Sequence, residues 1–472
     1  MPAEGTRMAR LWEREVGRLP PRRFAGAVRA SEEFVLGLQK RLQKHKRCVD
    51  TLCFNSSGSL LMSSSHDQTI ALWNLEEAVP RLMFQAGGDV SNAQFMPLSD
   101  DRSIVTCGAD GEVRHSRIRE GGCVFTDELV DLRYAVNKLA VEPGSPHTFF
   151  SCVEDGSVLL FDLRRKYPRK LFKCGALRRF GFLSGRTVIL RAIAVDPRNP
   201  SCFAVCGCDE YVRLYDARKI SMEMSKFGVP VEQFCPQHLV SSDSKRDGIS
   251  GLAFSHTGEI LASYSYENIY LFSREHGLYF NDFEENYSEK LPVPQTFRGH
   301  ENMQPIKGVS FFGPNCDYVI SGSDCGHVFI WRNKDGQLLR AMQADIRSVD
   351  CVEQHPTEIV IASSGIETDV KIWAPGDSEN PSTYNYDISV IAVLLANNDV
   401  GTGLGTSPDT NPFIIRGTGS DFDGSSYIDD VDMHSSGDDD VDDDEEDKEE
   451  EVGVDEDQKD DEDDMEHMND DR

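Results

Sequence analysis

The stretch that decides the fold is SCVEDGSVLLFDLR, residues 151 to 164. It places Asp155 and a glycine between two runs of alternating apolar and polar residues, a pattern typical of antiparallel strands joined by a tight turn. The second run ends in an aromatic residue, Phe161, followed by Asp162 and Arg164. An acid, a short turn, an apolar alternation and a closing aromatic therefore define one hairpin of half-buried strands.

The same frame recurs along the chain. Its acids are Asp67, Asp110, Asp155, Asp209, Glu267, Asp324 and Glu367, and its closing positions are Trp73, Ser116, Phe161, Tyr215, Phe272, Trp331 and Trp373. Successive closing positions lie 42 to 59 residues apart, with the longer intervals in the middle of the array. Repeats of about 40 to 45 residues with four strands each are typical of WD-repeat proteins. Another hairpin strand precedes most frames, as in ISGLAFSHTGEILASYS, residues 249 to 265.

We therefore expect an all-β fold, a seven-bladed WD-repeat β-propeller over residues 32–375, because closing the ring removes exposed sheet edges. The alternation in EEFVLGLQKRL, residues 32–42, predicts a strand that closes the ring as the outer strand of the last blade. Residues 1–31 are expected to form an N-terminal arm, either solvated or carrying a short docking helix. Residues 376–431 are expected to form an irregular linker. Residues 432–472, with 24 acids and 3 bases, predict a disordered acidic tail.

Polar residues recur at fixed places in two blades. They are His45, Ser65, Asp67 and Trp73 in the first blade and His300, Ser323, Asp324 and Trp331 in the sixth. This set resembles the buried His–Ser/Thr–Asp–Trp hydrogen-bond network of WD repeats, in which the histidine and serine satisfy a buried carboxylate. A Ser-His-Asp catalytic triad is the alternative. The structural role is favoured because the set repeats with the blade period, which nucleophilic sites do not.

The remaining composition argues against catalysis. The sequence contains no phosphate loop, metal signature or nucleophile elbow, so we expect a non-enzymatic protein with no cofactor and no metal. Thirteen scattered cysteines and no secretory leader favour a reducing compartment, the nucleus and/or the cytoplasm. The group Cys202, Cys206 and Cys208 lies in an apolar alternation, which favours structural thiols over a metal site. No apolar run is long enough to span a membrane.

Two strands end in the same way, at Asp162 and Arg164 and again at Asp216 and Arg218. The aspartate is ordinary turn chemistry, since its side chain accepts backbone N–H groups of the turn. The arginine two residues later shares its face in strand geometry. One interpretation is a weak surface ion pair. The other is a two-point anchor on one rim of the propeller, since arginine is a common interface hot spot.

The strings LLFDLRRK and VRLYDARK resemble the aromatic-Asp-x-Arg box of WD-repeat substrate receptors for cullin-4 ubiquitin ligases. The similarity extends over residues 34–375 and includes strings such as VISGSDCGHVFIW and DVKIWAP; the sequence departs from the family after Pro375. The resemblance implies that Arg164 and Arg218 contact the DNA-damage-binding adaptor that joins the propeller to cullin-4. It also implies a protein substrate, which the sequence does not identify.

A basic stretch separates the third and fourth frames. Between Leu163 and Val195 the chain has no acid but carries Arg164, Arg165, Lys166, Arg169, Lys170, Lys173, Arg178, Arg179, Arg186 and Arg191. A nucleic-acid surface is one interpretation, although few aromatic residues interleave the charges and the chain as a whole is acidic, so nucleic acid is not the expected partner. A solvated loop and a contact with the acidic tail are the others.

Two functions follow from the sequence. The first is the substrate-recognition subunit of a cullin-4 RING E3 ubiquitin ligase, which binds the adaptor and presents protein targets by raising their effective concentration. The second is a general WD-repeat scaffold, associated with chromatin or histones through the acidic tail. The fold alone does not separate them.

Overall fold

The structure is a computed structural model that describes residues 36–177, 183–220, 227–240, 248–277, 292–304 and 307–375. The N-terminal arm, the linker, the acidic tail and part of the basic stretch (Arg178 and Arg179) lie outside the described residues. Within the described ranges, no helix has the length and apolar character needed to cross a membrane.

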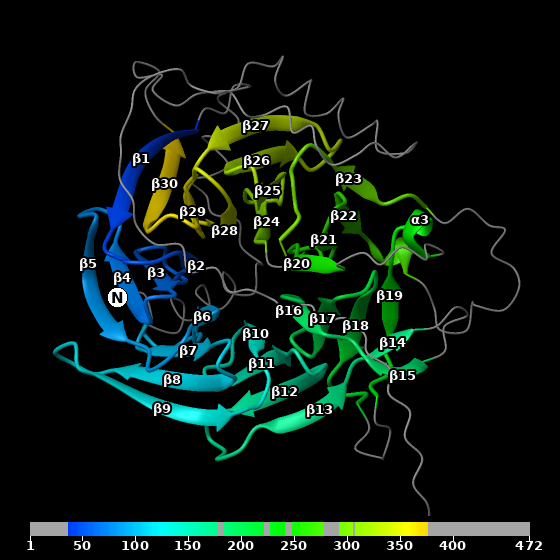
Figure 1. The fold of residues 1–472 in the computed structure, drawn as a ribbon, viewed down its shortest axis with the longest axis horizontal. Helices are drawn as coiled ribbons and strands as arrows, with labels where there is room; N and C mark the ends of the chain where they lie inside the picture. The colour runs from blue at the N-terminus through cyan, green and yellow to red at the C-terminus, as the bar shows by residue number, and fades with distance from the viewer. Residues whose placement is uncertain are drawn as a thin grey trace, which may run out of the picture. The chain divides into compact units, whose positions relative to one another are not determined.

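Seven four-stranded antiparallel sheets form the fold, which confirms the seven-bladed propeller predicted from the repeat. In Figure 1 the first strand of each blade lies nearest the centre and the fourth lies outermost. Blades 1 to 4 are β2 (Val49–Phe54), β3 (Leu60–Ser65), β4 (Thr69–Asn74), β5 (Val79–Gln85); β6 (Asn92–Phe95), β7 (Ser103–Cys107), β8 (Glu112–Ile118), β9 (Val124–Asp131); β10 (Val136–Val141), β11 (Thr148–Val153), β12 (Ser157–Asp162), β13 (Arg169–Lys173); and β16 (Leu190–Val195), β17 (Cys202–Gly207), β18 (Val212–Asp216), β19 (Glu232–Phe234). Blades 5 to 7 are β20 (Ile249–Phe254), β21 (Ile260–Tyr264), β22 (Ile269–Phe272), β23 (Gln295–Phe297); β24 (Val309–Phe312), β25 (Tyr318–Gly322), β26 (His327–Arg332), β27 (Leu338–Gln343); and β28 (Val349–Gln354), β29 (Ile361–Gly365), β30 (Asp369–Pro375), β1 (Leu36–Gln43).

The described connections hold four short elements besides the blades. A two-stranded sheet of β14 (Gly175–Leu177) and β15 (Leu183–Thr187) lies between blades 3 and 4 in the sequence. The helix α3 (Gln237–Val240) follows β19, and a 3₁₀ turn, η1 (Arg274–His276), follows β22.

The hairpin of β11 and β12 shows how the repeat frame specifies a blade. Its turn needs a residue with positive φ, and Gly156 occupies that position at φ +85°. The register then places Phe149 opposite Phe161, and their rings stack with centroids 4.6 Å apart. Both side chains are fully or almost fully buried, and each such burial contributes about 1.5–3 kcal/mol.

Ring closure joins the two ends of the described chain. β1 pairs with β30 from Leu36↔Pro375 to Gln43↔Asp369, so the first described strand is the outer strand of blade 7. Leu42 is completely buried in the cluster between blades 7 and 1. The pairing leaves no blade with a missing outer strand, so both ends of the array are covered.

The core lies between the blades. Trp73, Trp331 and Trp373, which close three of the repeat frames, are completely buried in these interblade clusters. In blade 2 the closing position is Ser116, whose hydroxyl forms a 2.8 Å hydrogen bond with the hydroxyl of Thr126 on β9. Blade 2 has four strands like the others, although its closing position is not aromatic.

Each blade presents two rims. The third strand of a blade begins at one rim, next to the acid of the repeat frame, and ends at the other. We call the first the turn rim, defined by the seven frame acids, and the second the Asp-x-Arg rim, defined by Asp162 and Asp216. The two groups of residues singled out by the sequence therefore lie on opposite faces of the ring.

Candidate functional site

The two Asp-x-Arg pairs have the same geometry on neighbouring blades. In blade 3, Arg164 Nε and Nη2 donate to the two carboxylate oxygens of Asp162 at 2.8 and 2.9 Å. In blade 4, Arg218 Nε and Nη2 donate to Asp216 at 2.9 and 2.8 Å. Each pair is thus a bidentate ion pair, the strong form of the arginine–carboxylate interaction.

The pairs form in turns, so the strand geometry inferred from the sequence is wrong. Asp162 and Asp216 are the last residues of β12 and β18, and each arginine lies in the turn that follows. The backbone N–H of Arg164 donates to Asp162 Oδ1 at 3.1 Å, and that of Arg218 donates to Asp216 Oδ1 at 3.0 Å. One carboxylate therefore fixes both the turn and the guanidinium.

A third pair of the same kind lies on this rim and was missed from the sequence. Arg198 Nε and Nη2 donate to Asp196 at 3.2 and 3.0 Å, and the Arg198 N–H donates to Asp196 Oδ1 at 2.9 Å. Its guanidinium lies beside Gly258 in blade 5, where a Cβ would overlap it. The string VDPR has the same spacing, but it follows the first strand of a blade and lacks the closing aromatic.

Blade 4 brings two of these pairs together around one residue. Cys202 lies opposite Asp216 in the sheet, and its carbonyl accepts the N–H of Asp196 at 2.8 Å. Burial, with the nearby carboxylates of Asp216 and Asp196, raises the pKa of the Cys202 thiol. The thiol therefore stays protonated. Because it carries no negative charge, it does not compete with Asp196 and Asp216 for Arg198 and Arg218.

The carboxylates are covered and the arginines are exposed. The side chains of Asp162 and Asp216 are 16% and 7% exposed, whereas both Arg164 and Arg218 are 64% exposed. The hydrogen bonds from Arg164 hold the pKa of Asp162 down at about 2, and those from Arg218 lower the pKa of Asp216. Both carboxylates are ionised at neutral pH, so each arginine is fixed in place with part of its guanidinium free for a partner.

On the turn rim, every frame acid has a basic partner. The pairs are Asp67 with His45, Asp110 with Arg114, Asp155 with Lys173, Asp209 with Arg213, Glu267 with His238, Asp324 with Lys307, and Glu367 with Lys371. In three blades the base lies four residues after the acid, a spacing that the sequence shows plainly. Each frame acid is therefore satisfied by a partner within the fold, as a buried carboxylate requires.

The network predicted for blade 1 needs one correction. His45 Nε2 and Trp73 Nε1 both contact the hydroxyl of Ser63, each at 2.7 Å. Ser65 instead donates to the carbonyl of Arg47, and its hydroxyl accepts the backbone N–H of Asp67 at 3.2 Å, so it supports the turn. The reason is strand alternation: Ser63 pairs directly with the third strand, whereas Ser65 is at the turn. Asp67 joins through the Thr69 hydroxyl, which donates to Asp67 Oδ1 at 2.5 Å and lies 3.0 Å from His45 Nδ1; His45 Nδ1 itself lies 3.5 Å from Asp67 Oδ2.

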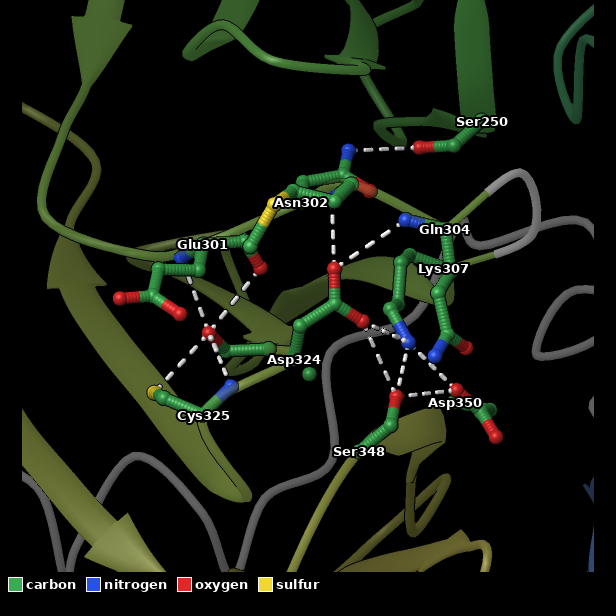
Figure 2. Close-up of polar contacts among 12 residues, drawn as sticks. Ser250, Glu301, Asn302, Gln304, Lys307, Asp324, Cys325, Ser348 and Asp350 are labelled. Carbon is green, nitrogen blue, oxygen red and sulfur yellow. Dashed lines mark hydrogen bonds and ion pairs between the residues drawn. The ribbon is translucent and has the colours of Figure 1, made fainter. Parts of the chain in front are cut away.

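The network predicted for blade 6 does not form. Asp324 turns to Lys307, whose Nζ lies 2.7 Å from Asp324 Oδ1 and 2.5 Å from Asp350 Oδ1, as Figure 2 shows. Ser323 accepts the backbone N–H of Glu301 at 2.9 Å. The prediction failed because a buried ammonium attracts the carboxylate more strongly than a neutral imidazole does.

His300 and Trp331 are left to pack together in blade 6. Their rings meet edge to face with centroids 5.6 Å apart, and Trp331 Nε1 donates to the carbonyl of Arg298 at 2.8 Å. Neither ring nitrogen of His300 has a hydrogen-bond partner among the described residues. Burial lowers the pKa of His300 to about 4, so the ring is neutral at physiological pH.

A cavity of about 310 Å³ lies between the inner strands and is lined by residues from all seven blades. The strand register shifts by one residue near the start of the first strand in five blades, at Asp50, Asn137, Arg191, Ser250 and Asp350. Each of these residues lines the cavity. A bulge re-aims the side chain it carries, so these five residues add polar groups to the cavity wall near the turn-rim ends of the inner strands.

Comparison with known proteins agrees with this architecture. The family model described as "WD domain, G-beta repeat" matches residues 37–74 and 292–332. Each match begins on or just before the outer strand of one blade and ends on the third strand of the next, so the sequence repeat is offset from the structural blade by one strand. This offset is what allows β1 to complete blade 7.

Several known proteins are similar to part of the chain. DDB1- and CUL4-associated factor 6 of Mus musculus and of Homo sapiens is 28% identical over 326 residues, which is 64% of this chain and 35% of that protein. Protein ALTERED SEED GERMINATION 2 of Arabidopsis thaliana is 29% identical over 273 residues, 52% of this chain and 36% of that protein. The chain thus spans about a third of the length of these relatives. It is a WD-repeat propeller protein similar to a DDB1- and CUL4-associated factor.

Proposed function

We propose that this chain is a substrate-recognition subunit of a cullin-4 RING E3 ubiquitin ligase, which binds the adaptor DDB1 through its Asp-x-Arg rim. The observation that carries the proposal is the matched pair of exposed arginines, Arg164 and Arg218, held by bidentate aspartates on neighbouring blades. The relatives that are named for association with DDB1 and CUL4 support it.

The geometry suits a stable interface better than a surface ion pair. A free arginine loses rotamer freedom when it docks, but Arg164 and Arg218 are already fixed by their aspartates. Each therefore offers a planar, charged donor group to a partner at a reduced entropic cost, which is the behaviour of interface hot spots. Arg198 on blade 4 extends the same surface to the boundary with blade 5.

An exposed aromatic residue lies next to the arginine of blade 3. Tyr167 is 71% exposed, and the ammonium of Lys166 lies 5.1 Å from its ring centroid. Tyrosine and arginine are both enriched at the centres of protein interfaces. We include Tyr167 in the adaptor-binding surface on this basis.

The opposite face is then free for the target protein. The turn rim is on the far side of the ring from Arg164 and Arg218. Recognition on one face and adaptor binding on the other would place a target near the ligase without any chemistry by the propeller itself.

The test is a pull-down of DDB1 and cullin-4 with the full-length chain from cell extract, followed by direct binding of purified DDB1. Recovery of both proteins, with direct binding to DDB1, is the expected result. A folded chain that binds neither overturns the proposal and favours the general scaffold.

A further inference from the structure

Three chemically different side chains meet on the turn rim of blade 1. The Cys48 thiol, the Asp50 carboxylate and the His66 imidazole each offer one donor atom, and these atoms all lie within 4.8 Å of one another. Cys48 precedes β2, and His66 lies in the turn after β3. The N–H of His66 donates to the carbonyl of Cys48 at 3.2 Å, which holds the two segments together.

The strand register turns Asp50 toward this group. The pairing of β2 with β3 shifts between Val49 and Thr51, so Asp50 is the bulged residue. A bulge re-aims a side chain away from the regular alternation. The cluster is therefore specified by backbone geometry as well as by residue type.

The imidazole of His66 is oriented as in a metal site. Its Nδ1 forms a 3.1 Å hydrogen bond with Asp89 Oδ1, and Asp89 is itself held by the N–H of Val90 at 3.1 Å. A carboxylate on one ring nitrogen fixes the tautomer that leaves the other nitrogen as an electron-pair donor. That nitrogen, Nε2, faces Asp50 Oδ1 at 3.7 Å, longer than a hydrogen bond.

One carboxylate oxygen of Asp50 is left unsatisfied within the cluster. Its Oδ2 is buried and has no hydrogen-bond partner among the described residues. The other three-ligand cluster on the described chain, Asp345, Glu367 and Asp369, is filled by the ammonium of Lys371. Within the described ranges, no lysine or arginine side chain forms an ion pair with Asp50. A buried, unsatisfied carboxylate oxygen calls for a cation.

We propose that Cys48 Sγ, the Asp50 carboxylate and His66 Nε2 bind one Zn²⁺ ion. Sulfur, imidazole nitrogen and carboxylate oxygen together suit zinc and exclude Mg²⁺ and Ca²⁺, which take oxygen ligands. Binding forms a Zn–S bond and releases the thiol proton of Cys48 to solvent. Three protein ligands leave the fourth tetrahedral position open to water or to a donor atom of a partner on the turn rim.

The test measures Zn²⁺ binding to the metal-free full-length chain, with Co²⁺ as a spectroscopic probe of sulfur ligation. We expect one Zn²⁺ per chain, and Co²⁺ absorption that reports a thiolate ligand. C48S and H66N should each weaken Zn²⁺ binding at least ~100-fold. D89N should weaken it about 10- to 100-fold, because the Asp89 carboxylate orients the His66 ring. C123S, which removes an exposed thiol in blade 2, is the matched control and should bind normally.

Circular dichroism of each variant verifies the fold, and binding to DDB1 on the opposite rim should be unchanged in C48S, H66N and D89N. The proposal is overturned if the chain binds no Zn²⁺ at micromolar free metal, or if C48S binds it as well as the unaltered chain. A cobalt spectrum without thiolate absorption likewise contradicts it.

Discussion

Replacing Lys371 with methionine should strongly destabilise blade 7. The ammonium is completely buried and contacts Asp369 and Glu367 at 2.6 Å each, besides Asp345, whose side chain is also completely buried. K371M removes the one buried cation that contacts Asp345, Glu367 and Asp369 among the described residues. Methionine keeps a side-chain volume close to that of lysine. Within the described part of the chain, the three carboxylates would then keep only the half-exposed Arg41, which lies 3.0 Å from Asp369 and 3.7 Å from Glu367, and Asp345 would lose its cation.

The expected loss follows from the cost of an uncompensated buried charge. Removing one partner of a buried ion pair typically costs about 3–5 kcal/mol in unfolding free energy. Part of the cost is relieved at low pH, because burial raises the pKa of Asp345 and the missing ammonium would raise it further. When the pKa of a carboxyl group is higher in the folded state than in the unfolded state, the group contributes most to stability at pH values below its unfolded-state pKa. That contribution is lost as pH rises through the folded-state pKa. The loss in K371M should therefore be largest near pH 7 and smaller near pH 5.

Urea unfolding followed by tryptophan fluorescence measures this directly, since Trp373 lies on the same strand. K334M, at an exposed lysine, is the matched control and should change stability by less than about 0.5 kcal/mol. D345N combined with K371M should recover part of the loss, because one charge is removed. A K371M chain within about 1 kcal/mol of the unaltered protein at pH 7 would refute the reasoning.

Three further predictions concern the propeller itself. Deleting residues 31–42 removes most of β1 and should lower the melting temperature by roughly 10 °C or more, measured by calorimetry; an unchanged melting curve would rule out the closing role. S63A should cost about 1–3 kcal/mol in urea unfolding, because the hydroxyl joins His45 and Trp73, whereas S65A should cost clearly less; equal effects would contradict the corrected network. Burial lowers the pKa of His300 to about 4. The contribution of this residue to the free energy of unfolding is therefore fully present above pH 6.5 and is lost as pH falls toward 4. H300N should remove up to roughly 3 kcal/mol of that pH dependence, and parallel stability curves would contradict it.

Most of the fold could be predicted from the repeat, because each repeat frame is a short local pattern in the sequence. Acid, glycine turn and closing aromatic are adjacent in the chain, so the position of a strand such as β12 follows from a few residues around Asp155. The ion-pair and hydrogen-bond partners of the frame acids could not be predicted in the same way, because they depend on distances in space that a local sequence pattern does not give. Asp324 could be assigned to His300 from the repeat alone, but Lys307 reaches it from the start of the first strand of the same blade.

The candidate site divides in the same way. The pairs at Asp162 and Asp216 were visible because an aromatic residue precedes each one. Asp196 and Arg198 have the same spacing after a different strand, and only the fold shows that they occupy the same rim. The cluster of Cys48, Asp50 and His66 depends on a β-bulge at Asp50, and the neighbouring sequence gives no signal that predicts this bulge.

The most direct test of the proposed function is the affinity of purified DDB1 for the full-length chain carrying both R164A and R218A. R332A is the matched control, because Arg332 ends the third strand of blade 6 and pairs with Asp335 at 3.0 Å on the same rim. The account predicts that the double variant, still folded, loses at least ~100-fold in affinity, whereas R332A binds normally. Equal affinity of the double variant and the unaltered chain would contradict it.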